Sequence, residues 1–151
     1  MNDLFKSIYA HYAADPLAAA LTDLYFTEAP PNAVFPYAVF SLVTDMANWT
    51  FTESFENCLV QFNIFSDTSS ATEIGELFVL LKGDVAAGEG FDFFELVLDN
   101  FDTVSMEREM SNLVRVEKVW QYNVTYRCVL QYSGEVAHNV INKFLYNLMS
   151  I

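Results

Sequence analysis

The sequence predicts an α/β domain of the α+β type, in which two or three helices pack on a mixed, mostly antiparallel sheet. Apolar and polar side chains alternate over 58–65 and over 120–132, which is typical of strands with one buried face. Apolar side chains instead recur every three or four residues over 2–14, 70–82 and 136–149, which is typical of helices that cover a sheet.

The chain is expected to form one domain that spans residues 1–151. Its length is common for a single domain and allows a sizeable core, and no internal repeat, low-complexity segment or long linker divides it. Residues 135–151 are expected to form a C-terminal helical extension of that domain.

The N-terminal third is predicted to contain one helix and one strand. The helix covers 2–14, and Pro16 marks a break after it. The segment 24–37 (LYFTEAPPNAVFPY) contains three prolines, which cannot donate hydrogen bonds in a sheet, so it is predicted to be a loop with a short extended piece. The strand near 37–45 is apolar on both faces, as expected for a strand inside a sheet that is covered on two sides.

The remainder is predicted to begin with a strand near 56–66 and a helix near 70–82. The start of this helix carries Ser70 and Glu73 at the spacing of a capping box, and Gly83 suits its end. Two further strands are expected near 93–107 and 115–132, followed by the helix near 136–149.

The charge balance excludes one class of function. Seven Lys and Arg against twenty Asp and Glu give a net charge of −13, so the protein repels phosphate backbones and anionic lipid headgroups. Sequence-independent nucleic-acid binding is therefore not expected. The acidic residues are scattered along the chain, which is typical of a solvated, folded surface.

Cysteine content and the chain's start indicate no disulfide framework and no export. Cys58 and Cys128 both fall on the apolar side of a predicted strand, so they are expected to be buried, reduced and slow to react. The N-terminus has an acid at position 3 and no apolar run after a basic region, so synthesis in the cytoplasm is expected. No apolar run approaches the ~20 residues of a membrane-spanning helix, and no membrane partner is expected.

Residues capable of catalysis are present but do not form a recognisable pattern. His11 and His138 lie on different predicted helices without metal-type spacing, and no glycine-rich phosphate loop occurs. Glu107 and Glu109 flank Arg108, an arrangement interpreted as a solvated face or as ion pairs between subunits. No catalytic, cofactor-binding or metal site is therefore expected, no cofactor is expected, and the chain is not expected to be an enzyme.

The order of elements resembles that of the tail-completion, or tail-terminator, proteins of long-tailed bacteriophages, prophages and phage-like gene-transfer particles. The resemblance covers nearly the whole chain up to about Tyr132. It is carried by the strand PYAVFSLVTD (36–45), the segment WTFTESFENCLVQFNIFSD (49–67), the helix SSATEIGELFVLLKG (69–83) and the strand WQYNVTYRCVLQY (120–132). The C-terminal helical segment 135–151 is a departure from the shortest members of the family.

This resemblance implies a structural protein that assembles as a homo-oligomeric ring, usually a hexamer. The ring would sit at the head-proximal end of the tail tube in the virion, after synthesis in the bacterial host cytoplasm. It would stop tube growth, contact the tail tube protein and the head connector or stopper protein, and let DNA pass without specific binding. Two alternatives remain: a small α/β enzyme or ligand-binding domain with a pocket under the 70–83 helix, and a head-side connector or tail-tube neighbour in the same virion.

Bulky aromatic residues precede the 56–66 strand and exceed what a core strand needs, which indicates a contact with another chain. The segment 46–56 is therefore predicted to be an arm or hairpin tip whose carboxylates stay wet or meet basic residues of the next copy. The predicted interface residues are Trp49, Phe51, Glu53, Phe55, Arg115, Lys118 and Arg127.

Overall fold

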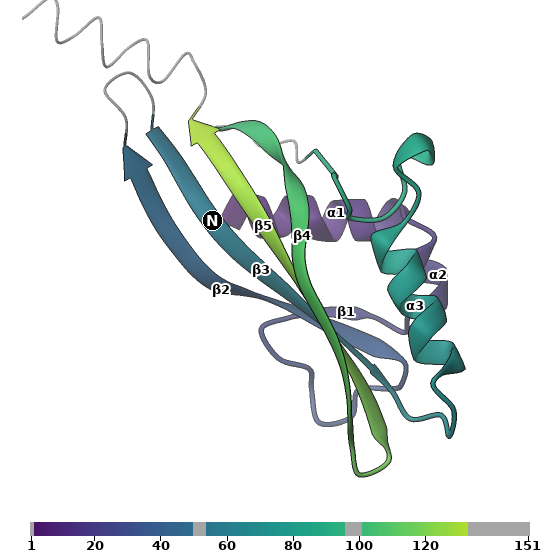
Figure 1. Cartoon of the computed structure of the whole chain (residues 1–151). Helices are drawn as coiled ribbons and strands as arrows, with labels where there is room; N and C mark the ends of the chain where they lie inside the picture. The colour runs from purple at the N-terminus through teal and green to yellow at the C-terminus, as the bar shows by residue number, and fades with distance from the viewer. Residues whose placement is uncertain (1, 50–53, 96–100, 133–151) are drawn as a thin grey trace, which may run out of the picture.

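The structure, a computed structural model, describes residues 2–49, 54–95 and 101–132 (Figure 1). Along the described residues, two helices precede the first three strands, and a third helix and a 3₁₀ turn precede the last two, so the helices can pack on a sheet built from distant segments. The elements are α1 (Asn2–Ala14), α2 (Leu17–Ala20), β1 (Leu24–Phe26), β2 (Tyr37–Trp49), β3 (Ser54–Ser66), α3 (Thr72–Lys82), the 3₁₀ turn η1 (Val85–Ala87), β4 (Phe101–Val116) and β5 (Val119–Tyr132).

The five strands of the described residues form one mixed sheet in the order β1-β2-β3-β5-β4. Only β1 and β2 are parallel; β2 with β3, β3 with β5 and β5 with β4 are antiparallel. The short β1 and the long β4 are the two edges of the sheet. The predicted α+β fold with a mixed, mostly antiparallel sheet is confirmed, and so is the strand assignment over 120–131.

The core lies on one face of this sheet. Every second residue of β3 from Cys58 to Ile64 is fully buried. The facing residues of β5 are Cys128, Tyr126 and Val124, which are fully buried, and Tyr122, which is half-buried. Leu4 and Ile8 of α1 and Ile74 of α3 belong to the same buried cluster, so both helices cover this face. The remaining members of the cluster, from the sheet, the helices and the loops next to them, are Tyr12, Leu17, Leu21, Leu24, Ala38, Phe40, Val60, Phe62, Leu77, Phe78, Leu81, Phe91, Met106, Val124, Tyr126 and Cys128.

The two cysteines lie directly opposite each other on neighbouring strands. Cys58 of β3 and Cys128 of β5 are Cα partners, and both are fully buried in the core face. No disulfide joins them. Burial raises the pKa of the Cys128 thiol to about 12, which keeps it in the unreactive protonated form. Their predicted burial is confirmed, and their slow reaction with thiol reagents remains a prediction.

The predicted boundaries of the last two strands were wrong. Strands were expected near 93–107 and 115–132, but β4 runs from Phe101 to Val116 and meets β5 through a two-residue turn. Glu117 in that turn has a φ of 57°. Glycine and asparagine normally mark such a turn, because they tolerate positive φ, and the pair Glu117-Lys118 gives no such signal.

The predicted capping box at the start of α3 was also wrong. Ala71 is the N-cap residue and makes no side-chain cap. Glu73 instead accepts a hydrogen bond at 2.7 Å from the hydroxyl of Ser66, which is fully buried at the end of β3 and needs an acceptor. Gly83 does end the helix, with a φ of 75°, and a Cβ there would lie 2.1 Å from the Glu89 carbonyl oxygen. The predicted helix near 136–149 lies outside the described residues.

Candidate functional site

Two residues of the aromatic segment that was predicted to contact another chain, Trp49 and Phe55, lie in β2 and β3. The backbones of Trp49 and Ser54 are partners in the β2–β3 ladder, and Phe55 pairs with Gln131 of β5. Phe51 and Glu53 lie outside the described residues. The backbone position therefore agrees with a hairpin tip, and its contact with another chain remains a prediction.

The predicted basic partners Arg115 and Lys118 lie at the opposite end of the sheet. Both belong to the end of the β4–β5 hairpin, where Trp120 pairs with Ser66 of β3. Phe55, near the other end of β3, pairs with Gln131, which is eleven residues after Trp120 in β5. Eleven strand residues separate the two ends of the sheet by a distance on the order of 35 Å. One chain therefore does not bring the two predicted groups together, and any contact between them would join different chains.

Arg115 is held over an aromatic ring. Its guanidinium carbon lies 4.5 Å from the centre of the Trp120 ring, and its Nη1 donates to the Ser69 carbonyl at 3.1 Å. These contacts tie the end of the β4–β5 hairpin to the loop before α3. The side chain remains exposed, as does that of Lys118 in the turn.

Arg127 has partners within its own chain. Its Nε donates to a carboxylate oxygen of Glu109, and its Nη1 donates to Oδ1 of Asn57 at 2.7 Å. The hydrogen bond to Glu109 is the main cause that raises the pKa of Arg127 above its ordinary value. A register shift between Arg108 and Met110 accompanies this pair.

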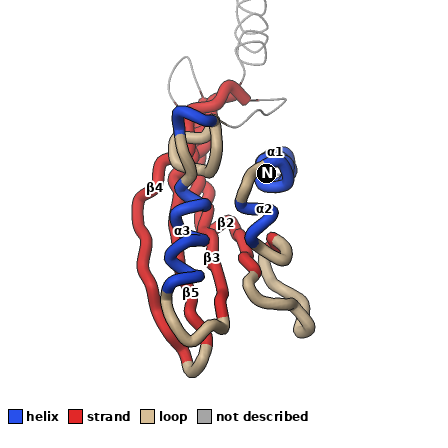
Figure 2. The backbone as a smooth tube through the Cα atoms, turned by 90° about the vertical axis from the view of Figure 1, so that its right-hand side faces the viewer, coloured by secondary structure: helices blue, strands red, loops and turns tan. Residues whose placement is uncertain are grey.

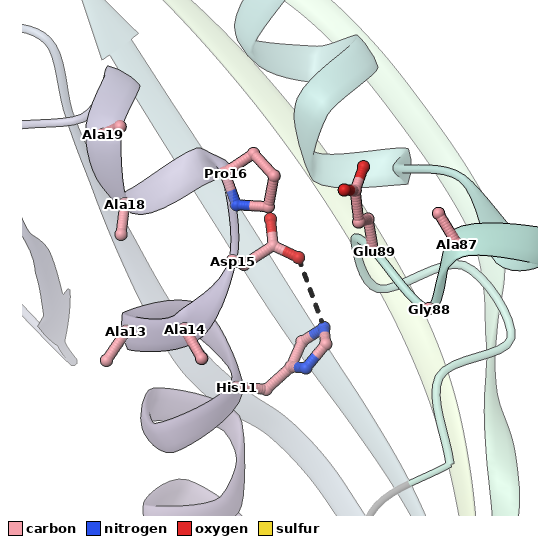
Figure 3. Close-up of a pocket in the computed structure, with 10 residues that line it drawn as sticks. All are labelled: His11, Ala13, Ala14, Asp15, Pro16, Ala18, Ala19, Ala87, Gly88 and Glu89. Carbon is pink, nitrogen blue, oxygen red and sulfur yellow. Dashed lines mark ion pairs between the residues drawn. The ribbon is translucent and has the colours of Figure 1, made fainter.

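A second set of polar residues lies where α1 turns into α2, facing the loop after α3 (Figure 3). A hollow of about 750 Å³ opens there, and His11, Asp15 and Glu89 are its ionisable lining residues. His11 Nε2 lies 3.6 Å from Asp15 Oδ2 and 2.7 Å from the Gly90 carbonyl oxygen. The His11 ring also stacks on Phe94, with ring centres 3.7 Å apart.

The hydrogen bonds of His11 and Asp15 form a clamp, that is, a set of contacts that holds the α1–α2 corner to the loop after α3. Asp15 is buried and accepts from two backbone amides, that of Leu17 at 3.1 Å and that of Gly90 at 2.7 Å. The Gly90 carbonyl requires His11 Nε2 to donate, so that nitrogen is not available as a base. The lining residues include no serine, threonine, cysteine or lysine that could act as a nucleophile. The group therefore joins the α1–α2 corner to the 83–91 loop.

Sequence reasoning missed this pair. His11 and Asp15 are four residues apart at the end of a helix, a spacing that places two side chains on one face. That signal was available, but only the fold shows that Gly90, 75 residues away from Asp15, donates to the carboxylate.

A third polar group lies beneath the loop that leads to β4. The buried Tyr126 hydroxyl donates to Oδ1 of Asp92 at 2.6 Å, and Arg108 donates to the same oxygen at 3.3 Å. Burial is the main cause that raises the pKa of Tyr126, and the hydrogen bond to Asp92 adds to it. The phenol is therefore a structural donor.

The part of the chain that the structure describes has neither a metal cluster nor a membrane-spanning helix. No cluster of three or more His, Cys, Asp or Glu there could hold a metal ion. None of the described helices is long and apolar enough to span a membrane.

Comparisons with known proteins identify the fold. No protein-family model matches the chain, and no curated protein matches it significantly in sequence. A chain in a solved structure described as "Virion of native gene transfer agent (GTA) particle" is similar, with a TM-score of 0.66 and 17% sequence identity. The match covers 86% of this chain and 96% of that chain. At this identity, the similarity shows that the two chains share a fold.

Proposed function

We propose that this chain is a structural protein of a phage-like virion that forms a ring at the head-proximal end of the tail tube. There it would terminate tube polymerisation and provide the surface on which the head joins. Its function would be non-enzymatic. It would be located at the head–tail junction, where it would contact the tail tube protein and the head connector or stopper. DNA would pass through the ring without specific binding.

The observation that carries this proposal is the structural similarity to a chain of a gene-transfer-agent virion. The match includes 96% of that chain, so it concerns the whole fold and not a common fragment. The hollow beside His11 and Asp15 does not favour a rival enzyme, because the hydrogen bonds of these two residues join two segments of the chain.

A second position in the same virion is a specific alternative. The description of the neighbour names a virion and no component within it, which suits a head-side connector or a tail-tube subunit equally well. The strongly acidic charge of −13 suits each of these positions, since a ring around DNA must not retain phosphate.

The aromatic end of the β2–β3 hairpin is part of the proposal. We assign Trp49, Phe51, Glu53 and Phe55 to a surface that contacts a neighbouring subunit or the tail tube. The basis is the place of Trp49 and Phe55 near the end of the described β2–β3 ladder, together with the excess of aromatic residues in this part of the sequence.

Electron microscopy of particles made without this chain tests the proposal. Loss of a terminator is expected to give tails of variable, excessive length that carry no heads, because nothing stops tube growth or binds the head. Restoring the chain from a plasmid is the control and should restore tails of uniform length. Normal-length tails next to heads with bare connectors would contradict termination and favour the head-side position, and absence of tails would favour a tube subunit.

A further inference from the structure

Charge is distributed unevenly between the β4–β5 hairpin and the rest of the chain. Residues 101–132 contain four of the seven basic residues and four of the twenty acidic residues, so the hairpin carries no net charge. The rest of the chain contains sixteen acidic and three basic residues and carries the whole net charge of −13. The hairpin can therefore approach another copy of this chain with less repulsion than the rest of the chain as a whole.

The end of this hairpin is apolar and uncovered on both faces. Leu113 and Val114 are neighbours in β4 and so point to opposite faces, yet they are 41% and 37% exposed. Met110 and Val116 are more exposed still, at 66% and 61%. In Figure 1 the turn of the hairpin extends past the ends of the neighbouring strands.

β4 is an edge strand, and charged residues discourage pairing with another chain along only part of its length. Glu107, Arg108 and Glu109 occupy its middle, and charges of this kind discourage contact at an edge strand. Beyond them, the exposed apolar side chains are accompanied by two basic residues, Arg115 and Lys118, and one acidic residue, Glu117. The unprotected part of this edge is thus apolar with a slight positive charge.

An aromatic groove of about 490 Å³ lies at the other edge of the sheet, between α1 and β1. Phe5, Phe26 and Phe40 form its floor, with the rings of Phe5 and Phe26 4.2 Å apart and those of Phe26 and Phe40 5.3 Å apart. Phe26 is 48% exposed and Tyr9 at the rim is 45% exposed, so the aromatic surface is open to solvent.

The charge of the groove's rim complements that of the hairpin end. Tyr9 donates to Asp23 at 3.4 Å, and this carboxylate is the main cause that raises the pKa of Tyr9. Glu28 lies just beyond β1 and is exposed. With Lys6 as the basic residue of the lining, the rim is slightly negative where the hairpin end is slightly positive.

We infer that the end of the β4–β5 hairpin of one copy docks in the α1–β1 groove of a second copy of this chain. The two surfaces belong to opposite edges of the sheet, and Figure 2 shows β4 and α1 on opposite sides of the molecule. One copy cannot join them to each other. A contact between two different surfaces leaves one hairpin and one groove open after each addition, so it repeats, and it forms a ring where the rotation between successive copies closes. The inference rests on the proposed function for the closure of that ring.

Sedimentation velocity of two blocked variants and their mixture tests this contact. Val116→Glu places a charge at the apolar hairpin end, and Ala10→Glu fills the groove from an exposed position of α1. Each variant alone is expected to need a concentration on the order of 10-fold higher, or more, than the wild type to assemble. An equimolar mixture should form dimers and nothing larger, because it offers one intact hairpin and one intact groove per pair of chains.

Val79→Glu is the matched control. Val79 is as exposed as Val116, at 59%, but lies on α3, outside both surfaces, so this variant should assemble as the wild type does. Circular dichroism establishes that each variant is folded, and Leu113→Glu replaces Val116→Glu if that variant unfolds. Normal assembly of either blocked variant, or a mixture that stays monomeric, would overturn the inference.

The test also separates this contact from the proposed function. A wild-type chain that remains monomeric at all concentrations would overturn the inference and favour its own residues 133–151 as the occupant of the groove. The role at the tail end would still depend on the micrographs of particles made without the chain. Conversely, dimers in the mixture would support the contact even if those micrographs showed tails of normal length.

Discussion

Replacement of Phe62 by alanine is expected to lower the free energy of unfolding by about 3–5 kcal/mol. Phe62 is fully buried at the centre of β3. Its ring lies 4.8 Å from that of Phe91, 5.8 Å from that of Tyr126 and 6.0 Å from that of Phe40, so its loss leaves a cavity between the sheet and the 91–94 loop. Urea unfolding followed by circular dichroism measures the change.

Phe93→Ala is the control for this substitution. This substitution removes the same kind of side chain, but Phe93 is 59% exposed. Its loss should therefore change the free energy of unfolding by less than about 0.5 kcal/mol. Equal effects of the two substitutions would show that the core is not centred on the face of β3 that carries Phe62.

Replacement of Asp15 by alanine is expected to lower the free energy of unfolding by about 2–3 kcal/mol. The carboxylate is buried and accepts from the amides of Leu17 and Gly90. Alanine leaves both donors buried without an acceptor and separates the α1–α2 corner from the loop after α3. Thermal and urea unfolding measure the loss, and hydrogen exchange at Gly90 should become faster.

Asp84→Ala is the matched control for the clamp. Asp84 also accepts from a backbone amide, that of Ala86 at 3.0 Å, but it is exposed, so water can replace it. Its replacement should cost about 1 kcal/mol or less. A loss at Asp15 no greater than that at Asp84 would mean that the Asp15–Gly90 contact does not hold the two segments together.

The sequence predicted the fold wherever periodicity was long and regular. The alternation in β3 and β5 placed Cys58, Phe62 and Tyr126 on the buried face, and the helical stripe of α3 placed Ile74 and Leu81 there, as the structure confirms. Periodicity works in these elements because one face of each packs on a single core. The N-terminal helix was predicted with its correct bounds for the same reason.

What the sequence could not predict depends on contacts between distant segments. The register that sets Cys58 opposite Cys128, and the reach of Asp15 to Gly90, follow from the packing of the sheet and its helices. The start of β4 was placed too early because the apolar run after Gly90 resembles a strand, whereas Phe91 enters the core from a loop. Arg127 was predicted to contact another chain. Its ion pair with Glu109 of the same chain could not be predicted, because it depends on how β4 pairs with β5 around the register shift between Arg108 and Met110.

Electron cryomicroscopy of the purified wild-type chain at assembling concentration tests the central claim most directly, since it resolves both the assembly and the surfaces that meet. The expected result is a closed ring in which Leu113 and Val116 of each copy lie in the groove formed by Phe5 and Phe26 of the next. A ring whose copies meet through other surfaces, or a two-fold dimer in which hairpin meets hairpin, would contradict it.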